Sequence, residues 1–119
     1  MNRAPLVTTP ELLTVTAVVE LATGVALLFI PGLVGSVLLG IAGTELTNLF
    51  ARCFGVALIA LGIACWPKPV TSAAVRAMWV YNGAIALYLA YIGAFINSGP
   101  LLWPAVAFHA VMTFLLLRR

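Results

Sequence analysis

The chain has 119 residues, of which 64% are hydrophobic and only 8% are charged, and its formal net charge is +3. Soluble domains are about half apolar and about a quarter charged, so this composition excludes a water-soluble globular fold. The basic residues are scattered near the ends of the predicted helices and form no stripe, which excludes a nucleic-acid-binding surface. The sequence therefore predicts a single all-α domain over residues 1–119, an integral membrane four-helix bundle.

The first apolar run covers residues 11–30 and is long enough, at ~1.5 Å per residue, to cross a bilayer. Thr9, Pro10 and Glu11 are typical of a helix start, with Thr9 as the predicted N-cap. Glu20 lies near the middle of this run, where a carboxylate is costly unless it is protonated, paired or in contact with water. We therefore expect the face around Glu20, which includes Leu13, Thr16, Thr23, Gly24 and Leu27, to turn into the bundle.

Pro31 and Gly32 break the first helix, and the apolar segment 33–41 that follows is too short to cross a bilayer. We expect this segment to lie at the membrane surface or to form a re-entrant turn. The second and third predicted spans, 46–66 and 72–96, carry small residues at four-residue spacing, which favours close packing between helices. The remaining predicted spans cover residues 46–66, 72–96 and 101–117.

Basic residues are distributed unevenly between the two sides of the predicted bundle. Four spans place both termini on one side, and the opposite side holds only Glu45 and Arg52 as charged residues. By the positive-inside rule, the side with more lysine and arginine is cytoplasmic, so both termini are predicted to be cytoplasmic. The basic side collects Arg3, Lys68, Arg76, Arg118 and Arg119.

Polar residues inside the spans fall at comparable depths. Helical rise places Glu20, Arg52 and His109 at similar levels, and Asn82 deeper. We therefore predict an ion pair between Glu20 and Arg52, with His109 beside it and Asn82 closing the cluster from below. Two interpretations stay open: a satisfied internal pair that fixes helix register, or a pocket that binds a polar headgroup, quinone ring or anion, or relays a proton.

Specific catalytic chemistry is not indicated by the sequence. One histidine does not provide bis-histidine haem ligation within a chain, and no HxxxH or ExxH spacing is present for a metal. The sequence shows no nucleophile–base pair, because a lone His109 among scattered serines and threonines is typical of any core histidine. Cys53 and Cys65 lie ~18 Å apart on one predicted helix and are interpreted as small hydrophobic residues. We therefore assign no catalytic residue, no metal ligand and no specific cofactor, and favour a non-enzymatic role.

Several motifs resemble those of small bacterial DoxX-like membrane proteins. These are ELATG around Glu20, LLFIP ending at Pro31, LLG at 38–40, and RxxGxALxxLGxAxW from Arg52 to Trp66. The likeness covers the first two predicted helices and extends to the LLWPA…H segment at 101–109. It implies a multi-pass, four-helix protein of the bacterial inner membrane. Some relatives in that family are subunits of a quinone-linked thiosulfate oxidoreductase.

The polar cluster and the resemblance together predict an accessory membrane subunit that binds a quinone or a lipid-like ligand. Its expected partners are membrane lipids and either another membrane protein or further copies of itself. An alternative is an oligomeric small-solute transporter or channel, because so small a chain needs copies of itself to enclose a path. A third hypothesis is a haem-binding redox protein that uses His109 from two protomers.

Overall fold

The computed structural model describes residues 6–119, and this part of the chain contains five helices and no strand. The all-α prediction is confirmed, and every helix bound agrees with the predicted range to within two residues. The helices are α1 (Thr9–Phe29), α2 (Pro31–Leu39), α3 (Glu45–Ala64), α4 (Ser72–Phe95) and α5 (Leu102–Leu117).

Three of the helices begin with a threonine that caps the first turn. The hydroxyls of Thr8, Thr44 and Thr71 each accept a hydrogen bond from the backbone N–H three residues ahead. At α1 the Glu11 carboxylate accepts a hydrogen bond from the Thr8 N–H in return, which completes a capping box. The predicted N-cap is therefore wrong by one residue, because Thr9 is already part of the helix.

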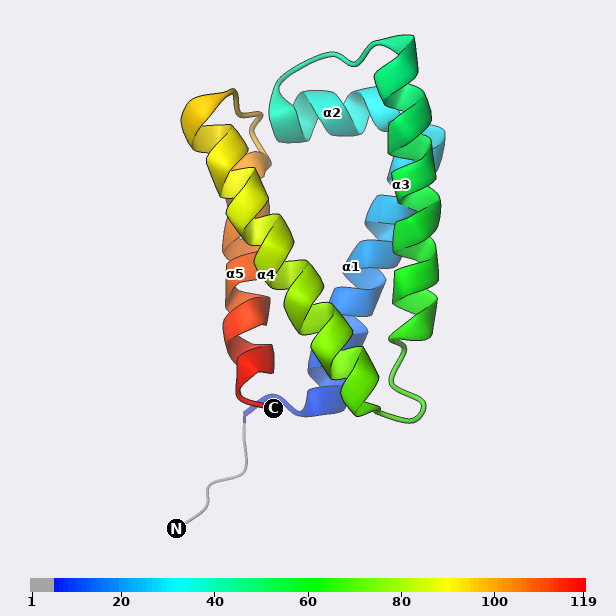
Figure 1. The fold of residues 1–119 in the computed structure, drawn as a ribbon, viewed down its shortest axis with the longest axis vertical. Coiled ribbons are helices and arrows are strands. Elements are labelled where there is room, and N and C mark those ends of the chain that lie inside the picture. Colours follow the sequence, from blue (N-terminus) through cyan, green and yellow to red (C-terminus); the bar gives the residue numbers. More distant parts are fainter. Residues whose placement is uncertain (1–5) are drawn as a thin grey trace.

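The four long helices form two antiparallel pairs, α1 with α3 and α4 with α5 (Figure 1). The pairs approach each other at the end where α1 begins and α5 ends, and they separate toward the opposite end. There α2 crosses from one pair to the other, so the two pairs form a V with α2 across its wide end (Figure 1). We call the first the basic end, after Lys68, Arg76, Arg118 and Arg119, and the second the α2 end.

The first helix pair is held together at two glycines. A Cβ atom placed on Gly24 of α1 would lie 2.6 Å from the carbonyl oxygen of Gly55 on α3, and one on Gly55 would lie 2.5 Å from the carbonyl oxygen of Gly24. Two turns along α3, a Cβ on Gly62 would lie 2.6 Å from the side chain of Leu21. Helices in lipid associate by close backbone approach, so these glycines set the spacing of α1 and α3.

The two pairs are joined near the basic end by buried side chains from α1, α4 and α5, together with Cys65 after α3. The next turn of α1, α4 and α5 carries polar residues instead, which form the site described below. The basic-end core consists of Leu12, Leu13, Ala17, Cys65, Ala74, Met78, Met112 and Leu116.

At the other end, α2 is tied to the α4–α5 connection by backbone hydrogen bonds. The N–H groups of Gly99 and Leu101 donate to the carbonyl oxygens of Leu38 at 3.0 Å and Val37 at 2.8 Å. These carbonyls lie in the last turn of α2, where a helix provides no internal partner. α2 ends at Gly40, whose φ of 70° is the left-handed conformation that glycine adopts without steric cost.

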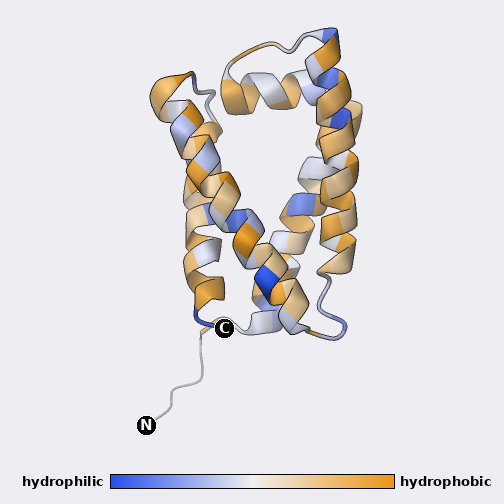
Figure 2. Cartoon of the chain, in the orientation of Figure 1, coloured by the Kyte–Doolittle hydropathy of each residue, from blue (hydrophilic) through white to orange (hydrophobic). Residues whose placement is uncertain are grey.

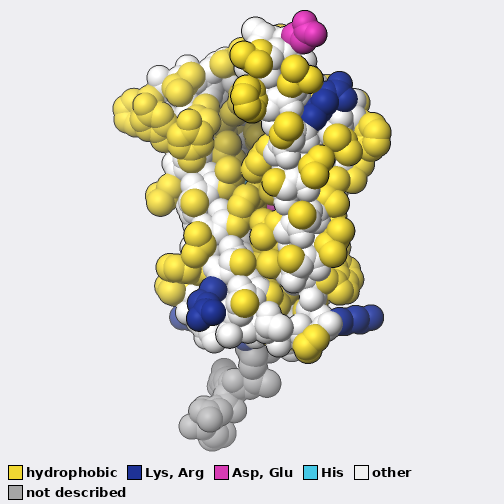
Figure 3. All heavy atoms as spheres, turned by 45° about the vertical axis from the view of Figure 1, so that its right-hand side comes forward, with side chains coloured by type: hydrophobic (Ala, Val, Ile, Leu, Met, Phe, Trp, Pro, Cys, Tyr) yellow, Lys and Arg dark blue, Asp and Glu magenta, His cyan; other side chains and the backbone are white. Residues whose placement is uncertain are grey.

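Helices α1, α3 and α4 are long and apolar enough to cross a membrane, and α5 is a shorter apolar helix of 16 residues. Large apolar side chains are exposed on every long helix, and Figures 2 and 3 show hydrophobic colour along most of their sides. Water-soluble monomers rarely expose such continuous apolar surface. The helices therefore have the length, composition and surface expected of a membrane protein.

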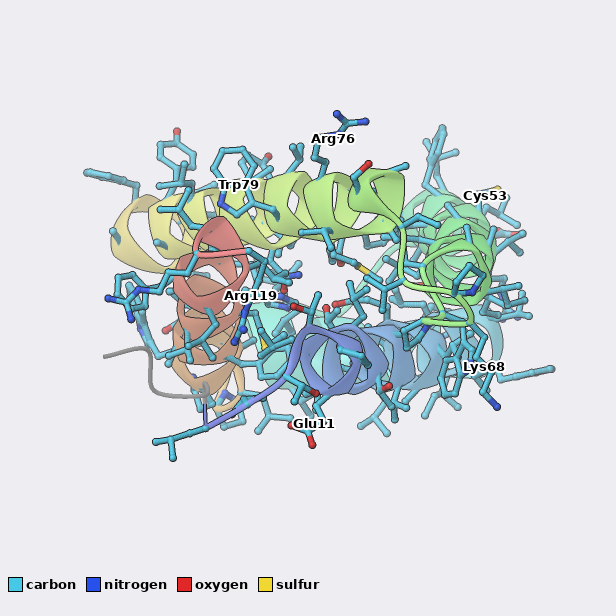
Figure 4. All side chains as sticks on the ribbon, turned by 90° about the horizontal axis from the view of Figure 1, so that it is seen from below. Glu11, Cys53, Lys68, Arg76, Trp79 and Arg119 are labelled. Atoms are coloured by element: carbon cyan, nitrogen blue, oxygen red, sulfur yellow. The ribbon has the colours of Figure 1, made fainter. Side chains whose placement is uncertain are left out.

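Charged side chains lie mainly at the two ends of the bundle (Figure 3). Glu45 is the first residue of α3, which begins at the α2 end (Figure 1), and Arg52 lies two turns further along that helix. Figure 4, seen from the basic end, shows Lys68 and Arg76 pointing away from the bundle. Arg3, which belongs to the predicted basic side, lies outside the described residues.

Candidate functional site

A cluster of polar side chains lies inside the bundle, one helical turn beyond the basic-end core. Glu20 on α1 is only 1% exposed although it lies in the middle of an apolar helix. On the same face Leu13, Thr16 and Leu27 are buried, and Thr23 is half-buried. The predicted inward orientation of this face is confirmed, and it places an acid inside the protein.

Asn82 on α4 is the centre of the hydrogen-bond network. Its Nδ2 donates to the backbone carbonyl oxygen of Met78 at 2.8 Å and to Oγ1 of Thr16 at 3.0 Å. A carbonyl oxygen only accepts, so the amide nitrogen must face Met78 and Oδ1 must face the other way. Oδ1 lies 2.7 Å from Nδ1 of His109 on α5. Because Oδ1 also only accepts, Nδ1 of His109 carries the proton of this hydrogen bond.

His109 lies between Asn82 and Glu20. Its Nδ1 is 3.9 Å from Oε1 of Glu20, which is too long for a hydrogen bond. The imidazole packs edge-on against Tyr81, with ring centroids 5.9 Å apart, and against Phe108, at 5.1 Å. Three helices thus contribute an acid, an amide, an imidazole and a phenol to one buried region.

One oxygen atom of the cluster has no hydrogen-bond partner. Over residues 6–119, Oε1 of Glu20 is the single fully buried side-chain nitrogen or oxygen for which no partner is found. Leaving a buried polar atom unpaired costs about 1–3 kcal/mol, and more for a charged group. Native proteins pair nearly all such atoms, so an unpaired one indicates strain or a place where a further group binds.

The predicted ion pair between Glu20 and Arg52 is not present. Arg52 is exposed, and its Nη1 donates to the carbonyl oxygen of Leu28 at 2.7 Å. That carbonyl lies in the last turn of α1, where the break at Pro31 leaves it without a partner and where the helix dipole favours a cation. Helical rise gives the depth of an α-carbon and not the direction of its side chain, and the arginine extends to a level two turns beyond Glu20.

The structure therefore brings together three of the four predicted cluster residues, Glu20, Asn82 and His109, and separates Arg52 from them. It adds Met78 and Tyr81, which the sequence-based prediction does not include. Met78 lies four residues before Asn82 on α4, so the helical period already places it on the same face. The position of Tyr81 depends on helix rotation, for which the sequence carries no comparable signal.

An acid and an imidazole in contact can hold a proton and can donate or accept hydrogen bonds. Within the part of the chain that the structure describes, no group of three His, Cys, Asp or Glu side chains is placed to hold a metal ion. Two surface pockets occur toward the basic end, one beside the α3–α4 connection and one between α4 and α5. Neither is lined by the cluster, so these pockets play no part in the site.

Comparison with known proteins gives no match: no protein-family model, no curated protein and no solved structure is similar to this chain. Three features of the molecule therefore bear on its function. These are the buried cluster, the exposed apolar surface and the separation of charge between the two ends.

Proposed function

We propose that the chain is a four-span protein of the bacterial inner membrane, with no reaction of its own, that binds a quinone-type or lipid-like amphiphile. The polar head of that ligand binds at Glu20 and His109, and the apolar tail lies among the helices or in the surrounding lipid. The resemblance to DoxX-like proteins supports this role, because some of those proteins serve quinone-linked enzymes. The protein then acts as an accessory subunit beside a catalytic partner.

The observation that carries the proposal is the unpartnered Oε1 of Glu20. Asn82 is hydrogen-bonded to Thr16 and to Nδ1 of His109 beside it, while this oxygen is fully buried and has no hydrogen-bond partner. A purely structural cluster has no reason to retain such an atom, because burial of an unpaired acceptor lowers stability. A bound group that donates a hydrogen bond to Oε1, or that accepts one from the protonated carboxyl, removes this cost.

Access from the bilayer follows from the arrangement of the two helix pairs. α3 and α4 diverge toward the α2 end (Figure 1), and the surface between them is hollowed on the face drawn in Figure 3. α2 covers the α2 end of the bundle, and hydrogen bonds to the α4–α5 connection hold it there. A ligand that reaches the cluster between α3 and α4 therefore enters sideways from lipid, which favours an amphiphile over a water-soluble solute.

The proposed topology rests on the length of the helices and on charge. α5 is about 24 Å long at helical rise and lies along α4, so it spans most of the hydrocarbon core beside it. Lys68, Arg76, Arg118 and Arg119 all lie at the basic end, which makes that end cytoplasmic under the positive-inside rule. α1 begins and α5 ends at this side.

Binding is tested with the full chain in nanodiscs of phosphatidylcholine. Ubiquinone and menaquinone analogues with ten-carbon tails are titrated in, and quenching of the intrinsic tryptophan fluorescence reports binding. We expect saturable binding that weakens at least tenfold in Glu20→Gln, because the amide changes the hydrogen-bonding character of the site while keeping its shape. Glu45→Gln, which alters an exposed acid at the start of α3, is the matched control and should bind as the unaltered protein does.

Circular dichroism and a thermal melt of each variant establish that Glu20→Gln retains the fold before its affinity is compared. Absence of saturable binding by every analogue contradicts the proposal. Equal weakening in Glu20→Gln and Glu45→Gln contradicts it as well, because the effect would then not belong to the cluster.

A further inference from the structure

We infer that the cluster selects a head group that carries a hydroxyl, such as a quinol or an alkylphenol, over one that only accepts hydrogen bonds, such as a quinone carbonyl or an ether. The inference rests on the proposed function and deepens it by naming the chemistry of the ligand head. It follows from how the hydrogen atoms of the cluster must be arranged.

The neighbours of His109 determine which of its ring nitrogens carries the proton. The carbonyl of Met78 fixes the orientation of the Asn82 amide, and the amide oxygen then fixes the proton on Nδ1 of the imidazole. In the neutral ring this leaves Nε2 unprotonated, with a lone pair that accepts a hydrogen bond. Free histidine has no such constraint, so the tautomer is imposed by the packing of α4 on α5.

The charge of the His109 ring depends on whether a carboxylate bonds to it directly. A charged imidazolium inside a membrane protein needs a partner in direct hydrogen-bond contact, because burying an unpaired ion is costly. The nearest carboxylate oxygen, Oε1 of Glu20, lies 3.9 Å away, and it approaches Nδ1, which already donates to Asn82. No side chain in the described chain bonds to Nε2. The geometry therefore favours the neutral ring with a free acceptor.

The unpaired atoms of the cluster determine which hydrogen-bonding groups a ligand head needs. Nε2 of His109 needs a donor, and Oε1 of Glu20 lacks any partner. A hydroxyl donates its one proton to Nε2, and its lone pairs accept a hydrogen bond from Glu20 when that carboxyl is protonated, whereas a carbonyl or an ether leaves Nε2 unpaired in the buried site. Sites built to bond a hydroxyl reject analogues that lack it far more strongly than apolar pockets reject a change of size.

Nε2 of His109 is accessible to a ligand head group. Oε1 of Glu20 is the one fully buried side-chain nitrogen or oxygen without a partner between residues 6 and 119, so the unpartnered Nε2 must retain some accessible surface. The His109 side chain is indeed 9% exposed. The imidazole edge is thus more accessible than Glu20, whose side chain is 1% exposed.

The test uses two probes that differ by one hydrogen-bond donor, 4-dodecylphenol and its methyl ether 4-dodecylanisole. Each competes with the ten-carbon ubiquinone analogue on the full chain in phosphatidylcholine nanodiscs, and fluorescence reports displacement. We expect the phenol to bind at least tenfold more tightly than the ether. His109→Asn keeps an N–H donor near the Nδ1 position but removes the Nε2 acceptor, and it should reduce this preference to less than threefold.

The outcomes separate the two ideas. If the quinone analogue binds in a Glu20-dependent manner but the phenol is no better than the ether, the hydroxyl preference is overturned and the proposed function stands. If no probe binds, both are overturned. Should His109→Asn fail to fold, a second measurement decides, because the chain contains a single histidine.

That measurement is the ¹⁵N spectrum of histidine-labelled protein prepared without a polyhistidine tag. Protonated Nδ1 with bare Nε2 supports the inference. Protonated Nε2 with bare Nδ1, or protonation of both nitrogens, overturns it.

Discussion

Asn82 and His109 form the shortest hydrogen bond between two side chains within residues 6–119, at 2.7 Å between Oδ1 and Nδ1, and it joins α4 to α5. Replacing either residue by alanine leaves the other with an unpaired buried group. We therefore expect each single change to lower the free energy of unfolding, and the double change to cost less than the sum. Hydrogen bonds between membrane helices typically give a coupling of about 0.6 kcal/mol, with an upper bound near 1.7 kcal/mol.

The measurement is a double-mutant cycle, with unfolding followed by circular dichroism as dodecyl sulfate is added to protein in mild detergent. Asn97→Ala paired with His109→Ala is the control cycle, because Asn97 bonds to Gly40 in the loop at the α2 end and not to the cluster. A coupling of Asn82 with His109 as small as that of the control would contradict the network.

Arg52 provides a second prediction because its partner is the Leu28 carbonyl and not Glu20. Arg52→Gln should lower the free energy of unfolding by about 0.5–1.5 kcal/mol through loss of one hydrogen bond. Its effect should add to that of Glu20→Gln within about 0.5 kcal/mol, since the two side chains share no contact. Side chains in direct contact usually show a coupling energy of about 0.5–3 kcal/mol. A coupling above about 1 kcal/mol between Arg52 and Glu20 would therefore indicate an ion pair and contradict this prediction. Arg52→Lys, which keeps a cation near the end of α1, should lose less.

The fold follows from sequence features that act locally. Apolar runs of membrane length, together with breaks such as Pro31 and Pro67, locate each helix to within two residues. The inward face of α1 also follows, because Glu20 and its neighbours at helical spacing share the polar and small residues. These predictions succeed because they need only the helical period and the cost of a polar group in lipid.

The partners within the cluster do not follow in the same way. Depth along a helix is known from rise, but the contact of Asn82 with His109 depends on how α4 is rotated against α5. Arg52 illustrates the same limit, since a long flexible side chain reaches the end of α1 as readily as the interior. No pattern in a single sequence specifies these rotations.

The contact between Gly24 and Gly55 gives a third prediction. Gly24→Ala would place a methyl group 2.6 Å from a backbone carbonyl that has no room to move, so α1 and α3 must separate. We expect a loss of about 1–3 kcal/mol in the free energy of unfolding, as for overpacked cores. Gly32→Ala is the matched control, because a Cβ there meets nothing within 4 Å, and it should be neutral or stabilising. Equal losses in both variants would contradict the close approach.

A fourth prediction tests the topology. In a background of Cys53→Ser and Cys65→Ser, single cysteines replace Ser98 near the α2 end, Lys68 in the α3–α4 connection, and Arg119 after α5. A membrane-impermeant maleimide added to intact bacterial spheroplasts should label Ser98→Cys only. Lys68→Cys and Arg119→Cys should react after detergent treatment.

Arg119→Cys separates four spans from three, because three spans leave it on the same side as Ser98→Cys. Labelling of Arg119→Cys together with Ser98→Cys in intact spheroplasts would therefore mean that α5 does not cross the membrane. Labelling of Lys68→Cys and Arg119→Cys, without Ser98→Cys, would mean that the orientation of the four spans is reversed.

The last prediction concerns α2, which closes the wide end of the bundle through Gly99. The backbone of Gly99 lies directly against the carbonyl of Val37, so a methyl group there collides with it. Gly99→Ala should therefore detach α2 from the α4–α5 connection while leaving the basic-end core intact. Hydrogen–deuterium exchange of peptides covering residues 31–40 should become at least tenfold faster, because the last carbonyls of α2 lose the N–H groups that bind them. Gly83→Ala, where the nearest atom lies at an ordinary 3.4 Å, should leave this exchange unchanged. If the amide exchange of residues 31–40 is unchanged in Gly99→Ala, contacts other than these backbone hydrogen bonds hold α2 in place. The argument for sideways entry of a ligand, which relies on these hydrogen bonds, would then no longer hold.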